Sequence, residues 1–152
     1  MMNVEIAAVL SRYADLLEID GADTFRLRAY RFAADEIDAL GVGLSDLVAE
    51  GRSLEELPGV GKAIAEKIRV LVETGSLPQL DELEAKIPEI YLRLLKIPGL
   101  GIKRVKVLYD NLPLQDLQQL QQAIDNQDIQ RMPGFGKKME QTIADAVLKM
   151  EN

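Results

Sequence analysis

The sequence predicts an all-α protein, and three observations support that prediction. Apolar residues recur at helical spacing through most of the 152-residue chain. No segment alternates polar and apolar residues between hairpin turns, so we expect no β-strand. A loop of the form apolar-Pro-Gly-apolar-Gly occurs three times, at 57–61, 97–101 and 132–136, each time before an amphipathic segment. The repetition favours helical hairpins built from one recurring unit.

The first three expected helices follow from local start and stop signals. The first begins behind Asn3, which can cap a helix, and it ends at Gly21. The second is expected over 24–40 and stops at the glycines of 41–43. Ser45 can cap a short third helix.

The later helices are expected around the glycine loops. Ser53 and Glu56 have the spacing of a capping box and predict a further helix start. A helix of about three turns should follow Gly61 and end near Gly75, a residue suited to a helix C-terminus. The remaining helices are expected at 79–86, 88–96, 102–111, 114–123 and 137–150.

The composition excludes several classes of site. The chain has no cysteine and no histidine, so it has no disulfide, no zinc site of the Cys/His kind and no His-based catalytic triad. Any catalysis must use lysine, carboxylates, hydroxyl groups or the backbone. There is no apolar run of about 18 residues and no basic N-terminal region before an apolar one, so we expect neither a transmembrane helix nor a signal peptide.

The net charge conceals a pattern along the chain. With 18 basic and 25 acidic residues the protein carries −7, which alone argues against nucleic acid as a partner. The segments 25–31, 58–69 and 96–109 nevertheless carry +3, +2 and +4, and two of them contain glycine loops. An acidic protein that concentrates its cations beside such loops can still hold phosphate. Solvated helix faces of mixed charge are the alternative interpretation.

The glycine loops have the features of a phosphate-binding site. Two glycines separated by one residue let the chain turn tightly, and the first amides of the helix that follows have no internal partner. An anion is favoured there by the helix dipole, and a lysine follows each loop. We therefore expect DNA contacts at Gly59, Gly61, Lys62, Gly99, Gly101, Lys103, Gly134, Gly136 and Lys137. Amides that hold phosphate read no bases, so the binding should be sequence-independent. Three helix corners without a ligand are the alternative.

At these residues the chain resembles a known family. The loops are similar to the helix-hairpin-helix DNA-binding motif. Segments 25–34, 57–68 and 73–77 together resemble the N-terminal lyase domain of family X DNA polymerases, the DNA polymerase beta-like enzymes. Residues 90–150 resemble the fingers subdomain of the bacterial members. The resemblance implies a helical-bundle, lyase-like domain with one helix-hairpin-helix over 1–78, followed by a tandem helix-hairpin-helix domain over 79–152.

The resemblance also implies roles for single residues. Lys67 matches the lysine that forms a Schiff base with 5′-deoxyribose phosphate, and Tyr30 matches a tyrosine beside the reacting sugar. Arg26 matches a basic residue for the 5′-phosphate, with Arg28 as a further DNA-binding cation. That chemistry needs a neutral amine, which burial or neighbouring cations favour. A solvated surface lysine and a half-buried core tyrosine are the alternatives.

Two positions depart from the family pattern. Phe25 stands where the vertebrate enzyme has a phosphate-binding histidine, and Ala63 stands where it has a lysine, for which Lys62 can substitute. Both changes remove cationic or polar groups from the expected phosphate pocket.

Family hairpins bind K⁺ or Na⁺ through loop carbonyls, and no cofactor is implied for the lyase chemistry. Backbone oxygens suit such hard cations. The matching carbonyls belong to Glu55, Leu57 and Val60 in the first loop and to Leu95, Ile97 and Leu100 in the second.

Polymerisation is not expected of the chain as it stands, because it has no Asp-x-Asp pair for two metals and the family's palm would begin after Asn152. We expect a monomeric, cytoplasmic, nucleoid-associated DNA-repair module without a membrane partner. Its DNA would be gapped, nicked or 5′-phosphorylated, and 5′-deoxyribose-phosphate lyase activity is the enzymatic hypothesis. The acidic segments 32–57 and 110–130 motivate the alternative, a non-catalytic scaffold or protein-interaction domain.

Overall fold

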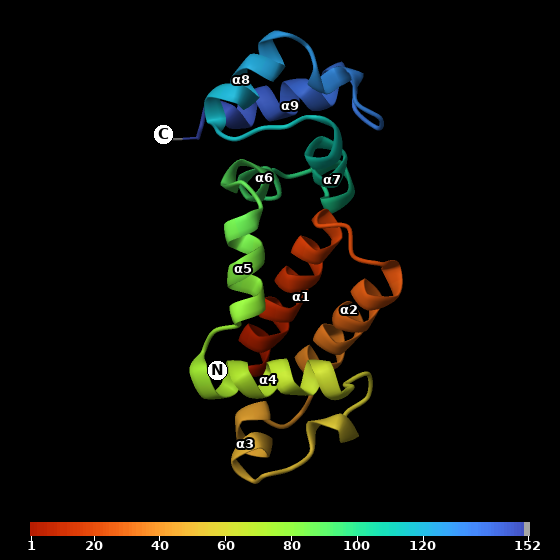
Figure 1. Cartoon of the computed structure of the whole chain (residues 1–152), viewed down its shortest axis with the longest axis vertical. Coiled ribbons are helices and arrows are strands. Elements are labelled where there is room, and N and C mark those ends of the chain that lie inside the picture. Colours follow the sequence, from red (N-terminus) through yellow and green to blue (C-terminus); the bar gives the residue numbers. More distant parts are fainter. Residues whose placement is uncertain (151–152) are drawn as a thin grey trace. The chain divides into compact units, whose positions relative to one another are not determined.

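The computed structural model describes residues 1–150, and within that range it contains helices and turns but no strand. The all-α prediction is therefore confirmed. The chain divides into two compact units, Met1–Leu83 and Glu84–Asn152, whose elements are labelled in Figure 1. The division falls inside α5 (Pro78–Lys86), whereas the sequence placed it after residue 78. The first turn of α5 carries the buried Leu80, which accounts for its place in the first unit. No helix in the described part is long and apolar enough to cross a bilayer.

The first unit is built on a pair of helices. α1 and α2 run in opposite directions and pack against each other, joined by a short turn in which Gly21 has a φ of +93° (Figure 1). Arg31 of α2 ties the pair together on its surface, because its guanidinium contacts Asp15 at 2.8 Å and Glu18 at 2.9 Å. The elements of the unit before α5 are α1 (Asn3–Ile19), α2 (Thr24–Asp38), α3 (Leu44–Ala49), the 3-10 turn η1 (Leu54–Glu56) and α4 (Lys62–Thr74).

In the core of the first unit, α4 packs against the pair formed by α1 and α2. Leu10 of α1, Ala33 of α2 and Ile68 of α4 are each fully buried. Small and branched side chains at these positions let the helices approach closely and exclude water. Gly75 ends α4 in the left-handed conformation, φ +81°, as the sequence predicted.

The second unit is held by a buried tyrosine. The Tyr91 hydroxyl donates to the Leu112 carbonyl and accepts from the Leu114 amide, both at 2.7 Å, so it fixes the connection before α8. Burial raises the pKa of Tyr91, which keeps the phenol protonated and able to donate. After α5 the elements are α6 (Glu89–Leu94), α7 (Ile102–Asn111), α8 (Leu117–Asp125), the 3-10 turn η2 (Ile129–Arg131) and α9 (Lys137–Val147).

Two residues that were expected to cap helices make long-range hydrogen bonds instead. Asn3 is the first residue of α1 and does not cap it; its side chain donates to the Val42 carbonyl at 2.8 Å and accepts from the Leu44 amide at 2.9 Å. Ser45 does not cap α3, which begins after Gly43; its hydroxyl donates to the Met1 carbonyl at 3.0 Å. The Asn3 side chain therefore fastens the loop before α3 to the start of α1, and Ser45 fastens α3 itself to the N-terminal residue.

Five other local predictions are wrong: one capping box, one helix start and three helix ends. Ser53 makes no capping hydrogen bond, and the expected capping box is replaced by the 3-10 turn η1. α8 begins at Leu117 rather than at 114, because Asp116 caps it by accepting from the Gln119 amide at 2.9 Å. Three helices end earlier than expected. α2, α6 and α9 end at Asp38, Leu94 and Val147, whereas the sequence predicted ends at 40, 96 and 150.

Candidate functional site

The three glycine loops share one backbone geometry. In each, the amide of the fourth residue donates to the carbonyl of the first across Pro-Gly: Val60 to Leu57 at 3.1 Å, Leu100 to Ile97 at 3.1 Å, and Phe135 to Met132 at 3.0 Å. The first glycine of each pair has a positive φ, +76°, +87° and +80° in chain order. Proline followed by a glycine of positive φ is the pattern of a type II turn. The repeat in sequence is thus a repeat in conformation.

The second glycine of each loop starts a helix. Gly61, Gly101 and Gly136 are the N-caps of α4, α7 and α9, and none has a side chain that could accept a hydrogen bond from the first turn. Gly61 and Gly101 are exposed, as is the lysine that follows each loop. Helix-start amides without a capping side chain, beside an exposed ammonium group, are suited to hold an anion.

The residue between the glycines anchors the loop. Val60 and Leu100 are 5% and 3% exposed, and Phe135 is half-buried. Their side chains insert into the unit while the glycines on either side face outward or lie near the surface. The side chain between the glycines therefore fixes the loop to the core of its unit, and the loop backbone stays accessible at the helix start.

The third loop has two internal ties. The Arg104 side chain of α7 donates through Nε to the Gly134 carbonyl at 3.1 Å, which joins the helix after the second loop to the third loop. Glu140 of α9 is buried, and its two carboxylate oxygens accept from the amide and the side chain of Gln130, each at 2.9 Å. The helix that follows the second loop is consequently hydrogen-bonded to the third loop within the second unit.

Lys67 lies on a pair of tyrosine rings in the first unit. Its Nζ is 5.8 Å from the centroid of the Tyr13 ring and 5.6 Å from that of Tyr30, within reach of cation–π attraction. The two rings meet edge to face with centroids 5.1 Å apart. Arg26 completes the group, because its Nη2 donates to the Tyr13 hydroxyl at 3.3 Å. Lysine, two aromatic rings and an arginine thus come together from three helices.

Tyr13 was missed as a site residue. It lies within the first expected helix, between Asn3 and Gly21, and nothing about that position marks it as a site residue. Burial raises the pKa of the Tyr13 phenol, Tyr30 adds to that effect, and the cations of Arg26 and Lys67 oppose it. The phenol therefore stays protonated at neutral pH. No local signal separates this tyrosine from an ordinary core aromatic, because its partners lie on other helices.

The other cations on these two helices lie at the surface. Lys62 and Arg28 are exposed, as Arg26 is, and Arg69 of α4 pairs with Glu66 at 3.6 Å. Phe25, beside Arg26, is 85% exposed. Arg26 is the cation that shares a contact with the half-buried Lys67. Arg26 donates to the Tyr13 hydroxyl, and Lys67 lies over the Tyr13 ring.

Phe32 covers one side of the first loop. The ring occupies the space where a Cβ on Gly59 would lie. No such neighbour surrounds Gly51, whose φ is +71° in the same unit. The ring leaves the helix-start residues Gly61 and Lys62 exposed.

We expect Gly59→Ala to lower the free energy of unfolding of the first unit by about 2 kcal/mol, and Gly51→Ala by about 1 kcal/mol. Both substitutions place a side chain at positive φ, but only the first displaces the Phe32 ring. Urea unfolding of the two variants measures the difference. In a Phe32→Ala background the two costs should become equal; a persistent difference would show that the ring is not its cause.

The expected cation ligands remain a prediction. Two of the six carbonyls, those of Leu57 and Ile97, already accept the turn hydrogen bonds, and a carbonyl oxygen retains a second lone pair. Among the described residues there is no cluster of acidic side chains that could hold a metal ion. A cation at these loops would therefore depend on backbone oxygens.

Comparisons with known proteins agree with this geometry. Residues 1–77 match the family model of a helix-hairpin-helix domain, and residues 91–147 match that of a SAM-like helix-hairpin-helix tandem. The chain is similar to the DNA polymerase/3′-5′ exonuclease PolX of Bacillus subtilis, with 32% identity over 97% of this chain and 25% of that protein. The resemblance to bacterial family X polymerases is thereby confirmed.

A second group of relatives is similar over a shorter stretch. The Holliday junction branch migration complex subunit RuvA of Pseudomonas putida is 29% identical over 67% of this chain and 49% of that protein. The RuvA subunit of Pseudomonas savastanoi is 28% identical over 67% of this chain and 50% of its own length. The chain therefore spans about a quarter of the PolX relative and about half of each RuvA relative.

Proposed function

The chain belongs to the helix-hairpin-helix domain family, and from that premise we propose that it binds DNA through the phosphate backbone without reading sequence. The observation that carries the proposal is the common geometry of the three loops. Each ends in an uncapped helix start with a lysine beside it. Amides arranged in this way suit phosphate oxygens and make no contact with base edges.

The DNA that fits the chain best has a break and a 5′-phosphate. Two units carry hairpins, so the chain can hold phosphates at more than one point along a strand. Arg26 and Lys67 both contact Tyr13, and the exposed Arg28 follows Arg26 on the same helix, which adds positive charge where a strand end could be held. PolX, a DNA polymerase, is similar over almost the whole chain, and that supports a role at gapped or nicked DNA.

Fluorescence anisotropy with labelled duplexes tests this proposal. We expect a Kd of roughly micromolar at low salt that weakens about 30-fold between about 50 and about 200 mM NaCl, because a few phosphate contacts release counterions. Two duplexes of unrelated sequence should bind equally, and a gapped duplex with a 5′-phosphate should bind more tightly than an intact one. Absent or salt-insensitive binding would remove the proposal.

A second candidate function is 5′-deoxyribose-phosphate lyase activity. The Lys67 amine lies against Tyr13 and Tyr30 and is half-buried, which restricts its access to water. In this reaction the amine would attack C1′ of the ring-opened sugar and lose water to give a Schiff base. Removal of a C2′ proton then breaks the C3′–O3′ bond and leaves a 5′-phosphorylated strand. Hydrolysis of the imine takes up water and frees the lysine.

A further inference from the structure

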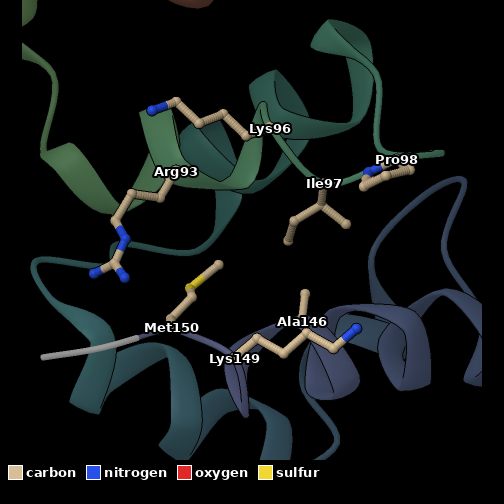
Figure 2. Close-up of a pocket in the computed structure, with 7 residues that line it drawn as sticks. All are labelled: Arg93, Lys96, Ile97, Pro98, Ala146, Lys149 and Met150. Carbon is tan, nitrogen blue, oxygen red and sulfur yellow. The ribbon is translucent and has the colours of Figure 1, made fainter.

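Cations meet apolar or aromatic side chains at two places in the chain. One is a hollow of about 390 Å³ in the second unit, where Ile97 and Ala146 face each other with Met150 beside them (Figure 2). The charged residues that line this hollow are all cations, namely Arg93, Lys96 and Lys149. Its lining includes no hydroxyl or carboxylate side chain that could join two of them. The other place is the Lys67 group of the first unit, where the Tyr13 side chain contacts both a lysine and an arginine.

Tyr13 contacts the two cations through different parts of its side chain. The Lys67 Nζ lies 5.8 Å from the centroid of the Tyr13 ring, and Nη2 of Arg26 donates to the Tyr13 hydroxyl at 3.3 Å. Ring and hydroxyl belong to one rigid phenol, so the two contacts cannot move independently of each other. A single side chain therefore constrains how far the Lys67 amine stands from the Arg26 guanidinium.

The Tyr13 phenol is itself fixed by packing. It is 3% exposed, and its ring meets that of Tyr30 edge to face with centroids 5.1 Å apart. Burial raises the pKa of the Tyr13 phenol, and Tyr30 and the carboxylate of Glu82 on α5 act in the same direction against the two cations. The hydroxyl therefore keeps its proton, and Tyr13 is a neutral support that adds no charge to the site.

The two cations differ in their access to a ligand. Arg26 is exposed, whereas Lys67 is half-buried. A guanidinium has five N–H donors, of which Tyr13 takes one, so the others remain for an anion. The carboxylate of Asp23 is engaged as the cap of α2, where it accepts from the Arg26 amide at 2.8 Å. An anion on Arg26 that carries a sugar can thus bring that sugar to the less accessible amine.

We propose that Tyr13 is a positioning residue of this site, which holds amine and guanidinium so that the sugar attached to a phosphate on Arg26 lies at the Lys67 amine. The ligand is a terminal sugar phosphate at a strand break. The inference rests on the proposed binding of broken DNA and, for its chemical step, on the proposed lyase activity. Tyr13 makes and breaks no bond: its ring supports the amine, and its hydroxyl orients the guanidinium.

The first test needs no chemistry at the sugar. Gapped duplexes with a 5′-phosphate or a 5′-hydroxyl are titrated with the full chain by anisotropy, and the ratio of the two affinities is measured. Tyr13→Phe should reduce the preference for the phosphate about threefold, because the guanidinium loses the hydrogen bond that orients it. In an Arg26→Ala background the same change should leave the ratio as it is, since no guanidinium remains to be oriented. Tyr109→Phe removes a hydroxyl from the second unit and is the matched control, with an unchanged ratio.

The second test separates the ring from the hydroxyl. Time courses of borohydride trapping on an incised abasic duplex, with protein in excess, give a maximal rate and a half-saturating protein concentration. Tyr13→Phe keeps the ring and should raise only the half-saturating concentration, about threefold. Tyr13→Leu removes the ring and should also lower the maximal rate about fivefold, because the amine loses one of its two aromatic supports. Circular dichroism and urea unfolding verify that each variant is folded.

Three results would overturn the inference. One is a full preference for the phosphate in Tyr13→Phe. Another is an equal loss of preference in the Arg26→Ala background, which would make the effect a general loss of packing. The third is a maximal rate that falls as far in Tyr13→Phe as in Tyr13→Leu, which would give the hydroxyl a direct part in the reaction. If the unaltered chain binds gapped DNA but gives no adduct, the lyase proposal fails, and the affinity ratio by itself decides the role of Tyr13.

Discussion

Replacing Lys67 with alanine is expected to abolish borohydride trapping of the protein on an incised abasic duplex. Only a Schiff base is reduced to a stable covalent adduct, so the loss should be at least about hundredfold if Lys67 is the nucleophile. Trapping is quantified as the fraction of labelled DNA that migrates with the protein on a denaturing gel. Lys67 lies in the middle of α4 (Lys62–Thr74) and outside the glycine loop, so its removal should leave the hairpins intact.

Lys62→Ala provides the control for this experiment. Lys62 stands on the same helix and carries the same charge, but it is exposed and lies at the helix start beside the first loop. It should weaken DNA binding a few-fold and still give the adduct once DNA is saturating. An adduct of undiminished yield from Lys67→Ala would remove Lys67 as the nucleophile. No adduct from the unaltered chain would remove the lyase proposal and leave the DNA-binding proposal to be judged by anisotropy.

Gly101→Asp should weaken duplex binding by about tenfold to hundredfold, while leaving the second unit as stable as before or more stable. Gly101 has an ordinary extended conformation, φ −80° and ψ 172°, and a Cβ there meets nothing within 4 Å. Aspartate is a preferred N-cap, so its carboxylate would accept the amides of α7 that are expected to hold phosphate. It would also repel the phosphate. Charge-assisted hydrogen bonds of this kind contribute about 1.5–3 kcal/mol.

Gly101→Ser separates the two effects. The serine hydroxyl can cap the helix without adding charge, so we expect a smaller loss of affinity than with aspartate. Gly61→Asp is the equivalent change in the first unit, where φ is −88° and the space is also open. Anisotropy gives the affinities and urea unfolding gives the stabilities. A variant that carries both Gly61→Asp and Gly101→Asp tests the alternative. If it folds and keeps full DNA affinity, the scaffold interpretation, in which the loops only connect helices, would be favoured.

The prediction of the loops succeeded because their conformation is decided locally. Proline fixes its own φ, and the glycine after it tolerates the positive φ that the turn needs. Gly59, Gly99 and Gly134 accordingly adopt the same conformation in three different surroundings. The helical segments were predictable for a similar reason, since apolar spacing is a property of neighbouring residues.

Residues whose partners lie far along the chain were not predictable. Asn3 and Ser45 were expected to cap helices, and their side chains instead bind groups about forty residues away. A side chain that can cap a helix can also accept or donate elsewhere, and packing decides between the two. The link from Arg104 of α7 to the Gly134 carbonyl likewise joins a helix and a loop whose residues lie 30 positions apart in the chain.

By itself, the sequence determined that this protein is helical, that three turns repeat in it, and that cations gather around two of them. The tertiary structure alone decided which side chains surround Lys67. Tyr13 reaches it from α1, Tyr30 and Arg26 from α2, and no spacing within one helix encodes that meeting. It also decided that Arg93 and Lys149 share a hollow. Turns and helices follow from the conformational limits of adjacent residues, whereas a site between helices exists only once their buried faces have packed.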